Sequence, residues 1–207
     1  MAGVIAVMAG LSAQTAPNTV IFDFSSGSGT VTIPGPTPSG AVIEVWGGGG
    51  GGGFGIEGVG DNGGGGGGAG GYSKTTLALS GADAAKTILY TVGARGTGSN
   101  TPDPGNTGGT STVSSGTYTI TPMIALGGGG GTSDANTIQG QGGTASGGSD
   151  TNTTGTGGGF LTRAGAAATA GVNGLQGGAG GDGGLPTIGG ETGDPGLPGR
   201  VRFVFTI

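Results

Sequence analysis

Short apolar segments recur along the chain, and each is bounded by Gly, Pro, Ser or Asn. Several are rich in β-branched and aromatic residues, which favour strands. The segment 201–205 alternates in a period of two, because Val201, Phe203 and Phe205 share one face. The predicted strands cover residues 19–24, 30–33, 41–46, 72–79, 87–92 and 200–207, with a Thr/Ser-rich run at 110–124. No stretch of ten residues has the pattern of an amphipathic helix, and the best helical candidate, 80–86, is one or two turns at most.

Glycine tracts separate these predicted strands. Continuous runs occupy residues 47–53, 63–68, 127–131 and 157–159. Glycine recurs at every third position from 171 to 183, and in a second frame from 178 to 199 that only Thr187 breaks. Three residues per turn is the period of polyproline II. Such tracts are either solvated flexible linkers or helices of this type packed side by side.

Packing is the interpretation we favour for the glycine tracts. A polyproline-II helix has no internal hydrogen bonds, so buried backbone groups must pair laterally with neighbouring helices. Ordering glycine costs more conformational entropy than ordering any other residue, so several tracts must share that cost. We therefore expect a mainly β fold with irregular glycine-rich structure: short antiparallel strands, packed polyglycine-II helices and almost no α-helix.

Composition limits the chemistry that the chain can perform. Glycine makes up 60 of 207 residues, and charged residues are 8% with a net charge of −5. The combined content of Leu, Ile, Val and Phe is below ~20%, the level under which a chain usually fails to bury a core. A disordered chain would also have a high net charge, which this chain lacks. With no Cys and no His, disulfides, thiolate or imidazole metal sites and the usual catalytic triads are excluded. Six basic residues in a chain of net negative charge are too few to form a basic patch that binds nucleic acid. We expect no enzyme and no cofactor.

Several motifs resemble ligand sites only weakly. Residues 177–185 approach a calcium-binding nonapeptide, but its apolar position holds Gly184 and the repeat does not recur in tandem. Strings such as 93–98 lack the strand–helix context and the lysine of a phosphate loop. The G-X-Y run at 193–199 is too short for collagen. We expect no metal site.

The carboxylates give no sign of a catalytic pair. A glycosidase needs two of them close together, and here they are spread singly along the chain, so we interpret them as solvated loop charges. They are Asp23, Glu44, Glu57, Asp61, Asp83, Asp103, Asp134, Asp150, Asp182, Glu191 and Asp194.

The chain divides into three parts. Residues 1–18 form an apolar N-terminal arm, 19–40 a β hairpin and a Pro-rich link, and 41–207 a glycine-rich domain. The apolar stretch in the arm is too short to span a bilayer, and the first basic residue is Lys74, unlike a signal peptide. Burial against the body or a neighbouring subunit is favoured over a lipid-facing segment or a signal relic. The arm candidates for assembly are Val4, Ile5, Val7, Met8 and Leu11.

The few aromatic residues are informative because most flank glycine tracts. Trp46 ends a predicted strand at the first tract, and a buried role is favoured over ligand stacking. Phe54 and Phe160 lie in glycine-rich, poorly shielded stretches, so packing and an exposed contact role remain open.

The order of strands and glycine tracts carries a resemblance. Residues 42–47 run into poly-Gly, 63–71 lead into Tyr72, and 90–94, 108–112, 125–131 and 199–203 follow. This order resembles the glycine-rich domain of bacteriophage tail fibres and other virion appendages, over residues 41–205. The resemblance implies a sandwich of polyglycine-II helices whose intervening loops contact the host surface.

On this basis we expect a phage virion protein at the particle surface, most simply a fibre-tip adhesin that binds without catalysis. Its partners would be other virion proteins through the arm, and a host-surface glycan or outer-membrane protein through the loops. It would be a homo-oligomer or multi-copy assembly, without nucleic-acid binding or membrane insertion. The alternative is a capsid decoration or fibre component with a purely structural role. The host-contact candidates are Phe54, Ile56, Asn100, Asp103, Asp134, Asn136, Asn152 and Phe160.

Overall fold

The computed structural model describes residues 18–35, 38–56, 63–133, 139–159, 177–185 and 190–207. Within these ranges the regular elements are strands, apart from one 3₁₀ turn, η1 (Gly81–Asp83). The strands are β1 (Thr19–Phe24), β2 (Ser28–Thr32), β3 (Gly40–Trp46), β4 (Tyr72–Ala78), β5 (Thr87–Thr91), β6 (Ser111–Ser115), β7 (Met123–Ala125), β8 (Ala145–Ser146), β9 (Thr151–Thr153) and β10 (Arg200–Thr206).

The strands form two antiparallel sheets. The first has the order β1–β10–β3–β4–β9 and the second β2–β5–β6–β7–β8. The last strand, β10, therefore lies inside the first sheet, between the edge strand β1 and the middle strand β3. At one edge of this sheet, the Ile207 amide donates to the carbonyl of Asn18, the first described residue, at 2.8 Å.

A hydrophobic core fills the space between the two sheets. It includes Ile43, Val45, Val201, Phe203 and Phe205 from the first sheet, all fully buried. The second sheet contributes Val31, Ile88, Val113 and Met123. Because side chains alternate along a strand, the period-two pattern of β10 puts its two phenylalanines on this inner face. This arrangement is a β-sandwich.

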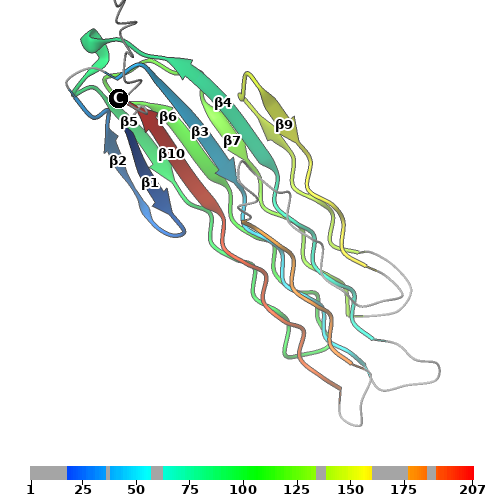
Figure 1. Ribbon diagram of the computed structural model, residues 1–207. Coiled ribbons are helices and arrows are strands. Elements are labelled where there is room, and N and C mark those ends of the chain that lie inside the picture. The colour runs from blue at the N-terminus through cyan, green and yellow to red at the C-terminus, as the bar shows by residue number, and fades with distance from the viewer. Residues whose placement is uncertain (1–17, 36–37, 57–62, 134–138, 160–176, 186–189) are drawn as a thin grey trace, which may run out of the picture.

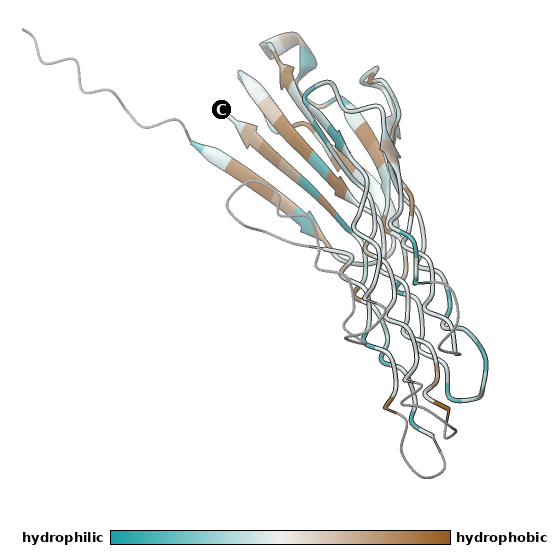
Figure 2. Cartoon of the chain, turned by 90° about the vertical axis from the view of Figure 1, so that its right-hand side faces the viewer, coloured by the Kyte–Doolittle hydropathy of each residue, from teal (hydrophilic) through white to brown (hydrophobic). Residues whose placement is uncertain are grey.

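The glycine-rich segments continue from the sheets as a bundle of extended chains (Figure 1). Figure 2 shows that brown apolar residues concentrate in the sheets, whereas the bundle is nearly white. We call this part the glycine bundle. Its described segments are residues 47–55, 63–71, 92–99, 105–110, 126–132, 139–144, 154–159, 177–185 and 190–199.

Backbone hydrogen bonds connect the segments of the glycine bundle with a period of three. In the segment 47–55, the amides of residues 47, 50 and 53 donate to the carbonyls of residues 71, 68 and 65. The amides of residues 48 and 51 donate to residues 109 and 106, and those of 49, 52 and 55 donate to residues 197, 194 and 191. Its carbonyls accept from three other segments, 96–99, 128–131 and 181–184. The segment is thus bonded to six neighbours, and its backbone groups pair laterally with other segments rather than within the segment.

The packing leaves no room for side chains at the contacts. A Cβ on Gly50 would lie 2.0 Å from the carbonyl oxygen of Gly129, and one on Gly51 would lie 2.1 Å from that of Thr97. A Cβ on Gly52 would lie 1.8 Å from the Asp182 carbonyl oxygen. In each case the obstacle is backbone held by hydrogen bonds of its own. The run 47–53 consists of glycine because only a hydrogen atom fits at the position of the side chain.

The expected mainly β class with short antiparallel strands is confirmed. The expected hairpin in residues 19–40 is wrong, because β1 pairs with β10 and β2 pairs with β5 in the other sheet. The candidate helix at 80–86 is reduced to η1. Trp46 is fully buried, although it contacts Tyr72 rather than joining the core between the sheets. The arm candidates Val4, Ile5, Val7, Met8 and Leu11 lie outside the described residues.

We predict that Gly50→Ala destabilises the fold by about 3 kcal/mol or more, because the new methyl group meets backbone that cannot move independently. Denaturant unfolding followed by far-UV circular dichroism measures the change. The matched control is Gly157→Ala, where the nearest atom to the new Cβ is 3.4 Å away. It should change the unfolding free energy by less than about 1 kcal/mol. Equal losses in both variants would contradict the packing argument.

Candidate functional site

The turn at residues 99–106 lies in the part of the glycine bundle away from the sheets, where its backbone pairs with Gly51 and Gly52. The segment 92–99 leaves the end of β5, and 105–110 returns to the start of β6. The two segments are joined by the Asn106 amide, which donates to the Thr97 carbonyl at 2.9 Å, and by the Gly109 amide, which donates to Ala94 at 2.7 Å. The glycine bundle therefore holds this turn away from the two sheets.

The predicted contact residues do not all lie together. Asn100 and Asp103 are exposed in the turn at 99–106. Phe54 and Ile56 are half-buried at the end of the central segment, where a Cβ on Gly190 would lie 2.3 Å from the Phe54 ring. Asn152 is in β9, where its side-chain amide donates to the Gly148 carbonyl at 2.7 Å, so it belongs to the sheet region. Asp134, Asn136 and Phe160 lie outside the described residues.

A hollow of about 530 Å³ opens beside the turn at 99–106, and we call it the tip hollow. Its side chains are mostly hydroxyls and amides, with one carboxylate. The lining residues are Thr97, Gly98, Ser99, Asn100, Thr101, Asp103, Pro104, Asn106 and Thr192. The tip hollow thus brings Asn100 and Asp103 together with polar residues that the sequence did not single out.

Hydrogen bonds fix the shape of the tip hollow. The Ser99 hydroxyl donates to the Thr101 carbonyl at 2.8 Å, and the Thr101 hydroxyl donates to Asp103 Oδ2 at 2.7 Å. Asn106 Nδ2 donates to the Thr97 hydroxyl at 2.6 Å. In addition, the Ser99 amide donates to the Gly52 carbonyl at 3.1 Å, which connects the turn to the segment 47–55. These contacts orient the polar groups before any ligand arrives.

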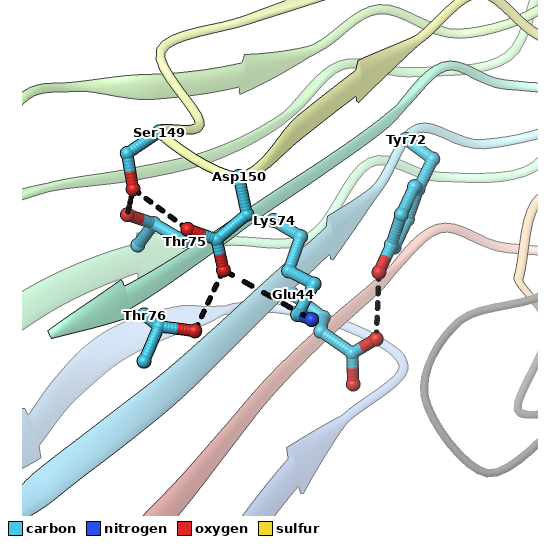
Figure 3. Close-up of polar contacts among 7 residues, drawn as sticks. All are labelled: Glu44, Tyr72, Lys74, Thr75, Thr76, Ser149 and Asp150. Atoms are coloured by element: carbon cyan, nitrogen blue, oxygen red, sulfur yellow. Dashed lines mark hydrogen bonds and ion pairs between the residues drawn. The ribbon is translucent and has the colours of Figure 1, made fainter.

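A second polar cluster lies on the outer side of β4 (Figure 3). Thr76 donates its hydroxyl to Asp150 Oδ2 at 2.6 Å, and Ser149 donates to Asp150 Oδ1 at 3.0 Å. Lys74 Nζ lies 3.9 Å from Asp150 Oδ2. The hydrogen bond from Thr76, followed by that from Ser149, lowers the pKa of Asp150 below its usual value. A carboxylate with a lowered pKa is a poor general base, so the cluster is best suited to hold the turn between β8 and β9 against β4.

Charged residues of alternating sign form a row across the first sheet. Antiparallel register places Asp23, Arg202, Glu44 and Lys74 on adjacent strands. Arg202 Nη1 lies 3.5 Å from Glu44 Oε2, and both residues are buried. Glu44 also accepts a hydrogen bond from the Tyr72 hydroxyl at 2.8 Å (Figure 3). The interpretation of Glu44 as a solvated loop charge is therefore wrong, because β3 carries it into a buried ion pair.

Burial raises the pKa of the Tyr72 hydroxyl, and the hydrogen bond to the carboxylate of Glu44 raises it further. An ionised Tyr72 would place two negative charges side by side, so the phenol remains protonated and continues to donate. The sequence indicated an unusual site at Glu44, because this carboxylate interrupts an otherwise apolar predicted strand. Its partner could not be named without the strand register.

Comparison with known families agrees with the composition. A family model described as a glycine-rich domain matches residues 25–204. The chain belongs to this glycine-rich domain family. The match includes nine of the ten strands at least in part, and it spans the glycine bundle and the tip hollow. No curated protein matches the chain.

The described part of this glycine-rich domain contains no group of three or more acidic residues placed to hold a metal ion. In the calcium-like stretch 177–185, the carbonyls of Gly178, Gly181 and Asp182 accept backbone hydrogen bonds from other segments. Within the described ranges, no helix has the length and apolar character needed to cross a membrane.

We predict that Tyr72→Phe lowers the unfolding free energy by about 1–3 kcal/mol near neutral pH, because it removes a donor from the buried Glu44 carboxylate. The control is Tyr118→Phe, a half-buried tyrosine whose ring lies near Lys86. Urea unfolding of both variants measures the difference. An unchanged Tyr72→Phe variant would contradict the role of this hydrogen bond.

The raised pKa of Tyr72 also sets a pH dependence. The unfolded phenol ionises near its ordinary pKa of 10.0, whereas the folded one resists ionisation. The contribution of Tyr72 is therefore complete below that pH and is lost as the pH rises above it. Unfolding measured between about pH 8 and 11 should show a steeper alkaline loss in the wild type than in Tyr72→Phe.

Proposed function

We propose that the chain is a bacteriophage virion surface protein, an adhesin that binds the host cell non-catalytically through turns of the glycine bundle that lie away from the sheets. The observation that carries the proposal is the separation of the turn at 99–106 from the pair formed by Asn18 and Ile207. These two residues pair beside the sheets, whereas the turn joins two segments of the glycine bundle at the level of Gly51 and Gly52. Attachment at one end and recognition at the other is the division of labour that an adhesin needs.

The architecture of the glycine bundle supports this division. Every segment is bonded laterally to neighbours, so the turns are carried on a rigid support rather than on a flexible linker. A rigid support loses little entropy when its turns bind. Many copies on one particle would multiply a weak contact into a stable one.

We predict that the double variant Asn100→Ala/Asp103→Ala reduces adsorption of the particle that carries the chain. Both side chains are exposed, so the change alters the recognition surface and leaves the glycine bundle intact. The matched control is Thr30→Ala/Thr32→Ala, two exposed positions of β2 at the sheet end. We expect adsorption to fall at least about tenfold in the first variant, the equivalent of ~1.4 kcal/mol. Unchanged adsorption of the Asn100→Ala/Asp103→Ala particles, or an equal loss in the control, would contradict the proposal.

The second candidate is a structural decoration of the capsid or fibre that the N-terminal arm attaches. The observation in its favour is that Asn18, which follows the arm, lies at the sheet end with the C-terminus. An attachment made just before Asn18 would therefore be on the sheet side of the molecule, away from the turn at 99–106.

We predict that deletion of residues 1–14 abolishes incorporation into the particle while the purified protein retains its unfolding transition. The amount of the chain in purified particles, measured by mass spectrometry, tests attachment. If the double variant at Asn100 and Asp103 adsorbs normally and the arm deletion still prevents incorporation, the decoration replaces the adhesin.

A further inference from the structure

The tip hollow has a lining of unusual chemistry. Among the described residues, the lining consists of three threonines, two asparagines, one serine, one aspartate, one glycine and one proline. This described lining contains no aromatic side chain, and Pro104 is its one apolar side chain. Its volume of about 530 Å³ lies within the range of small-molecule sites, roughly 300–1,000 Å³. Most such sites are lined by apolar side chains, and this one is not.

The polar groups of the tip hollow offer donors and acceptors together. A hydroxyl donates one hydrogen bond and accepts up to two, and a side-chain amide does both. A ligand that satisfies such a set must itself carry groups that donate and accept at short spacing. Neighbouring hydroxyls on a compact ring meet this demand, whereas an apolar ligand would leave the hydroxyls and amides without partners.

The charges around the tip hollow restrict the ligand further. Asp103 is the charged residue of the lining, and the exposed Glu191 and Asp194 flank Thr192. The described lining includes neither Lys nor Arg, and the whole chain has a net charge of −5. Anionic ligands are repelled by this field, and a neutral ligand is not.

The base of the tip hollow is rigid. Ser99 is buried, its amide donates to Gly52, and its carbonyl accepts from the Gly193 amide at 2.9 Å. Three segments of the glycine bundle therefore meet under the lining. Polar groups fixed in this way bind without the cost of being ordered.

We propose that the tip hollow binds a neutral polyhydroxylated ligand, of the class of an uncharged sugar unit in a cell-surface glycan. The biological setting of this inference rests on the proposed adhesin function, and the ligand chemistry rests on the lining. Asn100 and Asp103 contact the ligand, and Thr97, Asn106 and Thr192, which are also exposed, complete its hydrogen bonds.

The test is a titration of the ¹⁵N-labelled full chain with glucose, galactose, mannose, rhamnose and N-acetylglucosamine, followed by amide chemical shifts. A single weak site requires sugar concentrations from about 1 to 100 mM. We expect at least one sugar to cause saturable shifts at residues 97–106 and 192. Sialic acid and inorganic phosphate should cause none there. Saturable binding of the anions alone, or no saturable shift with any neutral sugar, overturns the proposal.

Variants separate a sugar site from a general surface effect. Asn100→Ala and Asp103→Ala should each weaken binding of the responding sugar at least tenfold, and Thr30→Ala, in β2, should bind as the wild type does. Equal binding by all three variants overturns the assignment to the tip hollow. If the protein binds no sugar but the double variant still abolishes particle adsorption, the ligand is a host protein, so this inference fails and the adhesin function stands. If sugar binding is lost in the variants while adsorption is normal, the adhesin function fails instead.

Discussion

The lateral hydrogen bonding of glycine backbone is the interaction on which the rest of this structure depends. A chain in an extended, three-residue repeat has no partner within itself, so each buried amide must find a carbonyl on a neighbouring segment. The segment 47–55 does so with six neighbours, three through its amides and three through its carbonyls. Such close approach requires hydrogen in place of a side chain, because a Cβ on any residue of 47–53 would lie within about 2 Å of a backbone oxygen. The high glycine content and the close lateral packing of the segments thus follow from the same requirement, the pairing of buried backbone groups.

The β-sandwich is what allows the glycine bundle to persist. Glycine tracts alone would lose too much entropy on ordering and would bury almost no apolar surface. The core between the sheets, with Phe203 and Phe205 at its centre, supplies the apolar burial that the tracts lack. Because the glycine segments are continuous with strands, the register of the sheets also sets the register of the bundle. Trp46 and Tyr72, which pair across β3 and β4, mark the point where strand becomes glycine segment.

The same arrangement gives the molecule two ends with different properties. The sheets hold the core and the row of alternating charges, and Asn18 and Ile207 pair beside them. Away from the sheets, the tip hollow presents hydroxyls, amides and a carboxylate on a rigid base. The proposed binding function would need no reactive group, because oriented polar groups and several copies on one particle would supply the affinity. The cluster around Asp150 serves the sheet end, since its hydrogen bonds hold the short strands β8 and β9 in place.

The sequence by itself determined the class of structure. Alternation at Val201, Phe203 and Phe205, β-branched segments and the three-residue glycine period are local signals, and each has a direct physical cause. Excluding imidazole and thiol chemistry likewise needed composition alone. Pairing across long distances was decided by the tertiary structure: β1 and β2 are neighbours in the chain, yet they join different sheets. Glu44 became part of a buried ion pair because β10, more than a hundred residues later in the chain, brings Arg202 beside it. The tip hollow likewise combines residues 97–106 with Thr192. The position of a glycine segment in the bundle depends on which carbonyl groups its amides reach. Because the glycines are identical, the sequence carries no information about which carbonyl groups those are.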